Sequence, residues 1–191
     1  MVRTTIKKEA FKPIEVIGEK ATIIRFTKQT VYNPVYEGEG DDRQPTGEVE
    51  DPGLVSCMEE MVYGELTPEV VRQIRLSELK AYDESDAVND ATYMGKHMWY
   101  DKVTRTCIAY SMQTEKADNK ETTILYDNDD EPHTLPIDLA IALFAQLELY
   151  AKACYNNTEA HKAALKGLET VDELLAYDIT AGYPEKLVIN E

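Results

Sequence analysis

The stretch 137–155, IDLAIALFAQLELYAKACY, decides the fold. Apolar side chains recur along it at helical spacing, so that Ile141, Phe144 and Leu147 share one face of a helix. Further leucines continue the apolar character around the cylinder, and a helix that is apolar on most of its surface is a buried one. The spacing therefore predicts a central helix over 137–155.

Two more helices are expected after the central one. Asn157 or Thr158 has the side chain of a helix N-cap, and Gly167 suits the C-terminus of the helix that follows it. Thr170 and Glu173 are spaced as a capping box, in which each side chain bonds the backbone N–H of the other residue. The pattern predicts a break near 156–158 and a new helix start at Thr170.

The first part of the chain is rich in strand-forming residues. β-Branched and aromatic side chains crowd 21–32, and a second run with imperfect alternation covers 54–66, so we expect a hairpin. Between them, 33–53 collects prolines, glycines and acidic residues without apolar periodicity, which indicates a mobile acidic loop. Thr67-Pro68 then opens a helix that runs to about Tyr82.

Short strands and one helix are expected between the two helical regions. Gly95 and Lys96 suit the tight turn of a hairpin that has Trp99 inside its second strand. The other elements expected here are a helix from Val103 to Met112 that is closed by the polar 116–120 segment, a strand over 121–126, an acidic turn, and an extended piece at 133–135.

These patterns predict an α+β fold. A β-rich N-terminal region, 1–66, contains the acidic loop 33–53. The second region, 67–191, is expected to form a small antiparallel sheet packed with several helices.

Composition limits the partners. Of the 191 residues 43% are hydrophobic, which is typical of a folding chain, and 20 basic against 36 acidic residues give a net charge of −16. Such a surface repels phosphate backbones and anionic membranes, so neither nucleic acid nor membrane is an expected partner. No apolar run resembles a signal peptide or a membrane span, and we expect a soluble protein made in the cytoplasm.

The cysteines favour a structural role. The chain has an odd number of cysteines, Cys57, Cys107 and Cys154, which are far apart in the sequence and have apolar neighbours. This pattern is typical of reduced, buried thiols rather than of disulfides or zinc ligands. Cys154 and His161 resemble a nucleophile and base. Because Cys154 belongs to the apolar stripe, a buried thiol with a capping or surface histidine is the preferred interpretation, and we expect no catalytic residues and no cofactor.

One acidic turn has a weak calcium pattern. Asp127, Asp129, Glu131 and Asp138 fall at positions 1, 3, 5 and 12 of a calcium-binding loop. Pro132 stands where that loop needs glycine for its sharp turn, and the flanking segments suit strands. An ordinary hairpin turn is therefore favoured over a cation site.

Aromatic residues supply the interaction candidates. Trp99 and Tyr100, with Tyr93, are suited to a sugar-stacking platform, although aromatics on short strands are more often core or interface residues. Tyr177 and Tyr183 are expected to pack the last segment onto the helices, with a docking surface for a neighbouring subunit as the second interpretation.

Several blocks of the chain resemble one domain family. They are 81–89 (AYDESDAVN), 99–105 (WYDKVTR), 115–123 (EKADNKETT), 147–155 (LELYAKACY), His161 and the closing 177–187 (YDITAGYPEKL). In this order they are similar to an uncharacterised domain family of phages and of prophages in gut bacteria. The acidic turn at 127–131 departs from the family, whose connection there is shorter and less charged.

The resemblance implies a function in a phage particle. Members of the family resemble accessory structural proteins encoded near tail, fibre or capsid genes. We expect a non-enzymatic structural or assembly protein that binds other phage structural proteins, forms a homo-oligomer, and moves from the host cytoplasm into the virion. The rival hypothesis is an intracellular acidic protein that inhibits a host factor by mimicking the charge of nucleic acid.

Overall fold

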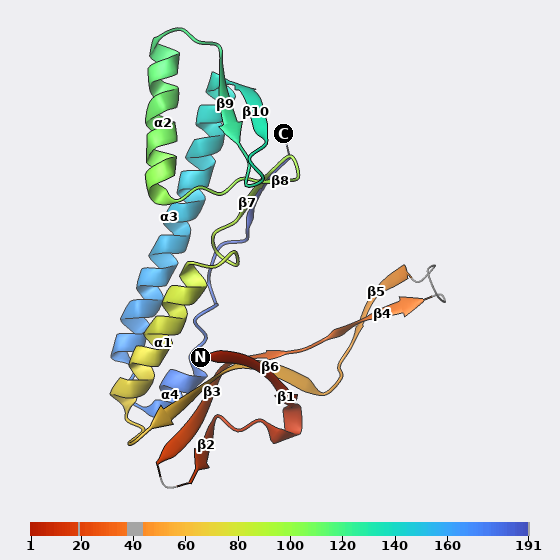
Figure 1. Ribbon diagram of the computed structural model, residues 1–191, viewed down its shortest axis with the longest axis vertical. Helices are drawn as coiled ribbons and strands as arrows, with labels where there is room; N and C mark the ends of the chain where they lie inside the picture. Colours follow the sequence, from red (N-terminus) through yellow and green to blue (C-terminus); the bar gives the residue numbers. More distant parts are fainter. Residues whose placement is uncertain (19, 38–43, 191) are drawn as a thin grey trace. The chain divides into compact units, whose positions relative to one another are not determined.

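The computed structural model describes residues 1–18, 20–37 and 44–190 (Figure 1). The chain forms two compact units. Unit 1 comprises Met1–Glu78 and Ala164–Ile179, and unit 2 comprises Leu79–Ala163 and Thr180–Glu191. The predicted α+β fold, with a β-rich N-terminal half and antiparallel sheets packed with helices, is confirmed.

Unit 1 is built on a four-stranded antiparallel sheet with the order β1-β6-β3-β2. Its strands are β1 (Val2–Lys7), β2 (Ile14–Ile17), β3 (Ala21–Thr30) and β6 (Leu54–Tyr63). Ile24 and Phe26 of β3 and Val55 and Cys57 of β6 are at most 1% exposed. The predicted pairing of 21–32 with 54–66 is confirmed, because β3 and β6 pair along most of their lengths.

A second, two-stranded antiparallel sheet joins β3 to β6. We call it the arm; it consists of β4 (Asn33–Glu37) and β5 (Gln44–Glu50) (Figure 1). The prediction of a loop over 33–53 is wrong for 33–37 and 44–50, which form strands, whereas 51–53 belong to no strand and 38–43 lie outside the described residues. A register shift after Pro34 and a positive φ of 82° at Gly47 let the strands pair despite the residues that suggested a loop.

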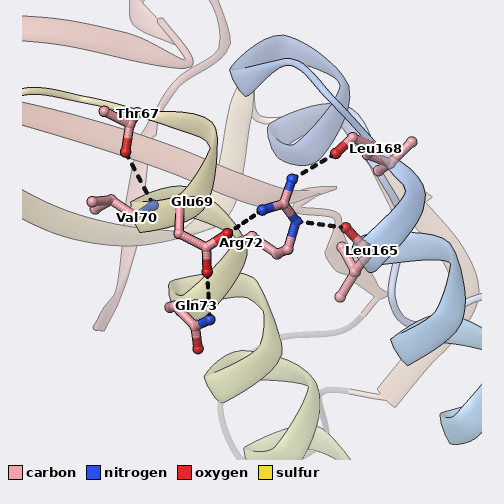
Figure 2. A network of polar contacts seen from close by, with 7 residues as sticks. All are labelled: Thr67, Glu69, Val70, Arg72, Gln73, Leu165 and Leu168. Atoms are coloured by element: carbon pink, nitrogen blue, oxygen red, sulfur yellow. Dashed lines mark hydrogen bonds and ion pairs between the residues drawn. The ribbon is translucent and has the colours of Figure 1, made fainter.

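Helix α1 (Pro68–Asp83) begins where the Thr-Pro-Glu pattern predicts. The Thr67 hydroxyl accepts a hydrogen bond from the Val70 N–H at 3.4 Å, which satisfies one of the free donors of the first turn (Figure 2). Glu69, also in the first turn, accepts hydrogen bonds from Arg72 and Gln73. The helix start and the approximate end of this helix are confirmed.

Arg72 connects α1 to the last turn of α3 (Ile137–Gly167) within unit 1. Its Nε donates to the Leu165 carbonyl at 3.2 Å, and a terminal nitrogen donates to the Leu168 carbonyl at 2.8 Å (Figure 2). The last carbonyls of a helix have no partner within the helix, so Arg72 caps α3 from outside.

The short helix α4 (Val171–Ala176) follows α3 in unit 1. The predicted capping box is confirmed, since Thr170 accepts from the Glu173 N–H and Glu173 accepts from the Thr170 N–H. Leu174 and Leu175 turn into the core, being 0% and 6% exposed.

Unit 2 contains two small sheets. One has the order β11-β7-β8 and the other pairs β9 with β10. The strands are β7 (Ala91–Tyr93), β8 (Lys96–His97), β9 (Thr122–Tyr126), β10 (Pro132–Pro136) and β11 (Leu187–Ile189), the last of which pairs with β7 in parallel.

The predicted hairpin around Gly95 is confirmed. Met94 and Gly95 both have positive φ, as two-residue hairpin turns require. The position of Trp99 within a strand was predicted wrongly, because β8 ends at His97. The Trp99 N–H instead donates to the side-chain oxygen of Asn128 at 2.9 Å, so a side-chain contact replaces the strand ladder at this point.

Helices α2 (Lys102–Ala117) and α3 enclose the core of unit 2. Its buried members are Met98, Met112, Leu125, Leu135, Ala140, Leu143 and Phe144. A second cluster lies farther along α3 and consists of Val88, Tyr150 and Cys154.

The predicted break in α3 is wrong, because the helix is continuous from Ile137 to Gly167. Thr158 does not cap a helix. Thr158 is only 2% exposed. Its hydroxyl donates to the Asp83 carboxylate at 2.6 Å and lies 2.8 Å from the Tyr183 hydroxyl. Asn157 donates to the Ala181 carbonyl at 2.9 Å. Tertiary partners therefore satisfy the side chains that otherwise compete with helix formation.

Among the helices that the structure describes, none has the length and apolarity needed to cross a membrane.

Candidate functional site

The arm has one apolar face. Pro34 lies opposite Val49 and Tyr36 lies opposite Pro45, and residues directly opposite in an antiparallel pair share a face. Pro34 and Tyr36 are two positions apart on β4, so the two pairs lie on the same side. All four residues are exposed, Tyr36 to 42% and Val49 to 62%. We call this surface the apolar face of the arm.

The opposite face of the arm is mostly polar, with the half-buried Val35 as its apolar residue on β4. It carries the pairs Asn33 with Glu50 and Glu37 with Gln44. The described residues of the two strands include three carboxylates, those of Glu37, Glu48 and Glu50, and no basic side chain. The arm is thus an amphipathic ribbon with negative charge beside its apolar face.

A bulge gives the arm its register. The Thr46 hydroxyl donates to the Val35 carbonyl at 3.1 Å and accepts from the Glu48 N–H at 3.2 Å. Because β5 has extra residues opposite Val35, Pro45 stands opposite Tyr36 and Val49 stands opposite Pro34, although the spacing of the partners differs on the two strands. The bulge therefore places Pro45, rather than Gly47, opposite Tyr36.

Prolines limit how the arm can bind. Pro34 and Pro45 have no N–H to donate, and proline on an exposed strand hinders the addition of a further strand. Contact through side chains is favoured over strand addition.

A pocket of about 510 Å³ lies in unit 1 beside β3 and α4. Tyr177, one of the interaction candidates, lines it and is half-buried. The remaining lining residues are Phe11, Pro13, Arg25, Phe26, Thr27, Lys28, Asp172, Leu175, Ala176 and Asp178.

Thr27 in this lining has an unusual backbone. Its φ of 49° is in the left-handed region, which β-branched residues rarely adopt, at a shift of register in β3. The Thr27 hydroxyl donates to Glu78 at 2.5 Å and accepts from Arg75 at 2.9 Å. Arg75 also pairs with Glu78 and donates to the Tyr177 carbonyl at 2.5 Å.

The ion pair of this polar cluster is buried. Arg75 is 0% exposed and Glu78 is 5% exposed. Burial lowers the pKa of Arg75 and raises the pKa of Glu78, because each charge has lost its water. Nε of Arg75 is buried without a hydrogen-bond partner among the described residues. The cluster holds β3, α1 and the chain at Tyr177 together, and it is a positioning element rather than a binding surface.

The buried arginine was not predicted, although the sequence contains a signal for it. Val71, Arg75 and Leu79 are spaced by four on α1, and all three are 0% exposed. A charge at the centre of a helix stripe that is otherwise apolar indicates a buried partner.

Trp99 and Tyr100 lie in unit 2. Trp99 lines a groove of about 650 Å³, and its ring meets the Tyr150 ring edge-on with centroids 6.1 Å apart. Tyr100 turns inward: its ring lies 5.5 Å from that of Phe144, its hydroxyl donates to the Tyr126 carbonyl, and burial raises its pKa to about 12.

Tyr183 packs the C-terminal segment within unit 2. Its ring stacks on His161 at 5.7 Å and meets Tyr82 edge-on at 5.3 Å. A ring nitrogen of His161 lies 2.9 Å from the Ala181 carbonyl. Cys154 is 3% exposed, and burial raises the pKa of its thiol, so the thiolate that a nucleophile needs is disfavoured.

The acidic turn is organised by Asp127. The Asp127 carboxylate accepts the N–H groups of Asp129 and Glu131, each at 2.9 Å, and lies 3.0 Å from Nε2 of His133. These bonds lower the pKa of Asp127, with the His133 bond as the largest cause. No group of three or more His, Cys, Asp or Glu within the described ranges is arranged to hold a metal ion.

In comparisons with known proteins, no family model, no curated protein and no solved structure matches the chain.

Proposed function

We propose that the protein is a non-enzymatic accessory protein of a phage or prophage that binds another phage structural protein through the apolar face of the arm. The observation that carries the proposal is the exposure of Pro34, Tyr36, Pro45 and Val49 on one side of a two-stranded ribbon. A two-stranded ribbon is marginally stable in water unless its apolar side packs on something. A partner that covers this side supplies that packing.

The structure also supports a non-enzymatic role through the use it makes of reactive residues. Asp127 closes a turn, His161 packs the C-terminal segment, and Cys154 lies in a core cluster. Each has a structural task that accounts for its surroundings.

The charge of the arm defines the partner. Glu37, Glu48 and Glu50 lie on its two strands, and the whole chain carries a net charge of −16. A complementary surface has an apolar centre and a basic rim, since matched charge steers association and rejects wrong partners. Full burial of the Val49 side chain would contribute about 1.5–3 kcal/mol.

Particle association tests the proposal with two variants of equal charge. Val49→Glu places a carboxylate on the apolar face, and Gln44→Glu places one on the polar face of the same strand. Each tagged chain is expressed together with the phage, particles are purified on a density gradient, and the chain is quantified by mass spectrometry. We expect wild type and Gln44→Glu in particles and Val49→Glu depleted about tenfold or more.

Different failures have different meanings. If wild type is absent from particles and captures no virion protein, the phage role is refuted. If Val49→Glu enters particles as well as wild type does, the arm is not the contact, although the phage role stands. Capture of a host factor that Glu50→Gln weakens and Val49→Glu does not would favour the inhibitor hypothesis instead.

Light scattering tests the proposed homo-oligomer. If the apolar face also joins copies of the chain, wild type is larger than a monomer and Val49→Glu is monomeric. Equal masses above that of a monomer would place self-association on another surface, and a monomeric wild type would refute the homo-oligomer.

A further inference from the structure

A polar groove of about 650 Å³ lies along α3 in unit 2. Glu148, Lys152 and Tyr155 line it from α3, Asp83 lines it from the end of α1, and Trp99 lines it from the segment before α2. Its volume lies in the range of small-molecule sites. The arm belongs to unit 1, so the groove is independent of the proposed protein contact.

The groove has charges of both signs. Its carboxylates belong to Asp83, Glu84, Asp101 and Glu148, and its cations belong to Lys102, Arg105 and Lys152. A strongly charged ligand of either sign would meet several like charges, which is destabilising. An uncharged ligand with many hydroxyl groups can donate to the carboxylates and accept from the cations at the same time.

Several of these side chains are already fixed. Arg105, 7% exposed, donates to Glu148 at 2.9 Å and to the Tyr100 carbonyl at 2.6 Å. Asp83 accepts the hydroxyl of Thr158 at 2.6 Å. Groups held in place before binding lose little conformational entropy when a ligand arrives.

Aromatic rings complete the groove. The guanidinium of Arg105 lies 5.0 Å from the Trp99 ring centroid, and the ammonium of Lys152 lies 4.6 Å from that of Tyr155. Tyr155 is 53% exposed. The C–H face of a sugar ring is apolar and packs on an aromatic side chain, while its hydroxyl groups reach the charged side chains around it.

We propose that this groove binds an uncharged saccharide, with Tyr155 and Trp99 as its apolar contacts and Glu148 as a hydroxyl acceptor. Trp99 is the only tryptophan of the chain, so tryptophan fluorescence reports on the groove directly. The full chain is titrated with maltose, cellobiose and N,N′-diacetylchitobiose, and in parallel with glucuronate and glucosamine as charged sugars. A saturable change with a neutral disaccharide and none with the charged sugars is expected.

Variants place the signal in the groove. Tyr155→Ala is expected to weaken binding about tenfold or more and Glu148→Gln several-fold. Tyr110→Ala is the matched control, because Tyr110 is a 75% exposed helix tyrosine that does not line the groove, and it should bind as wild type does. Circular dichroism confirms that each variant is folded.

Three results would overturn the proposal: no response to any of the neutral disaccharides, an equal response to the charged sugars, or an undiminished response in both Tyr155→Ala and Glu148→Gln. Cellohexaose is titrated beside cellobiose to identify the source of the ligand. Tighter binding of the hexaose indicates a polysaccharide, and equal affinity indicates a free small sugar.

Discussion

Replacement of Arg75 by methionine should strongly destabilise unit 1. Arg75 is 0% exposed and donates to the Thr27 hydroxyl, to Glu78 and to the Tyr177 carbonyl. Methionine keeps much of the side-chain volume but makes none of these bonds. It leaves the Glu78 carboxylate buried without its cation.

The size of the effect follows from this unpaired charge. Removal of one partner from a buried ion pair costs about 3–5 kcal/mol, and in a chain of this length that lowers the melting temperature by about 6–20 °C. Removal of both charges is much less harmful, because neither ion then loses its water. Arg75→Met with Glu78→Leu should therefore recover most of the stability that Arg75→Met loses.

The loss of stability caused by Arg75→Met should also depend on pH. Burial already raises the pKa of Glu78 above its ordinary 4.5, and Arg75 opposes this rise. Without Arg75 the pKa of Glu78 rises further, so the folded variant holds its proton to higher pH than the unfolded chain does. The stability that protonation of Glu78 provides is fully present below the pKa that Glu78 has in the unfolded chain. It is lost as pH rises through the higher pKa that Glu78 has in the folded variant. Arg75→Met should thus be closer to wild type at about pH 5 than at about pH 8.

Urea unfolding followed by far-UV circular dichroism measures these differences. The unfolding free energy of each variant is compared with that of wild type at the same pH, for both Arg75→Met and the double variant. The contribution of the other carboxylates, which titrate in all three proteins, cancels in this difference. A loss below about 1 kcal/mol for Arg75→Met, or a double variant no more stable than the single one, would refute the assignment of a buried pair.

Three further predictions test the remaining packing, one of them with a control variant. Arg72→Met should cost less than Arg75→Met, about 1–2 kcal/mol in urea unfolding, since it loses bonds to two carbonyls at a site nearer to water. Phe144→Asp should unfold unit 2, because Phe144 is 7% exposed, whereas Leu149→Asp on the same helix should leave the thermal melting curve nearly unchanged, since Leu149 is 72% exposed. Tyr150→Phe should lower the unfolding free energy by about 1 kcal/mol, because the Tyr150 hydroxyl donates to a buried backbone carbonyl at 2.9 Å; no change in the urea midpoint would contradict that bond.

Local signals were sufficient to predict much of the fold. The start of α1 at Pro68, the capping box at Thr170 and the turn at Gly95 each depend on a few neighbouring residues, and each is confirmed. Apolar spacing likewise predicted the first part of α3, because the periodicity of its core-facing residues is visible in the sequence alone.

Elements that depend on distant residues were predicted wrongly. Asn157 and Thr158 suggested a helix start, but their partners are Ala181, Asp83 and Tyr183, which lie far away in the sequence. No local sequence pattern indicates that these side chains have distant hydrogen-bond partners. Because they do, they do not compete with the helix backbone, and the helix continues where a break was expected.

The apolar face of the arm was missed because loop-forming residues dominate its sequence. Pro45 and Val49 are four positions apart and would share a face in a regular strand of period two, but the prolines and glycines of this segment indicated a loop instead. The bulge at Thr46 then sets the pairing, with Pro45 opposite Tyr36 and Val49 opposite Pro34. The cross-strand pairing of the candidate site thus depends on a bulge that no local sequence pattern indicated.

The buried Arg75 shows why a charge can remain in an apolar stripe. Apolar residues at positions 75 and 78 would continue the stripe of Val71 and Leu79 and would avoid the desolvation of two ions. Arginine instead joins three segments at once: the bulged strand at Thr27, its own helix, and the chain at Tyr177. An apolar contact tolerates sliding of one element over another, whereas directed hydrogen bonds to Thr27 and Tyr177 fit one register only. We infer that Arg75 selects the register of α1 on the sheet, so that the apolar double variant should stay stable while its β3 amides near Thr27 lose their protection from hydrogen exchange.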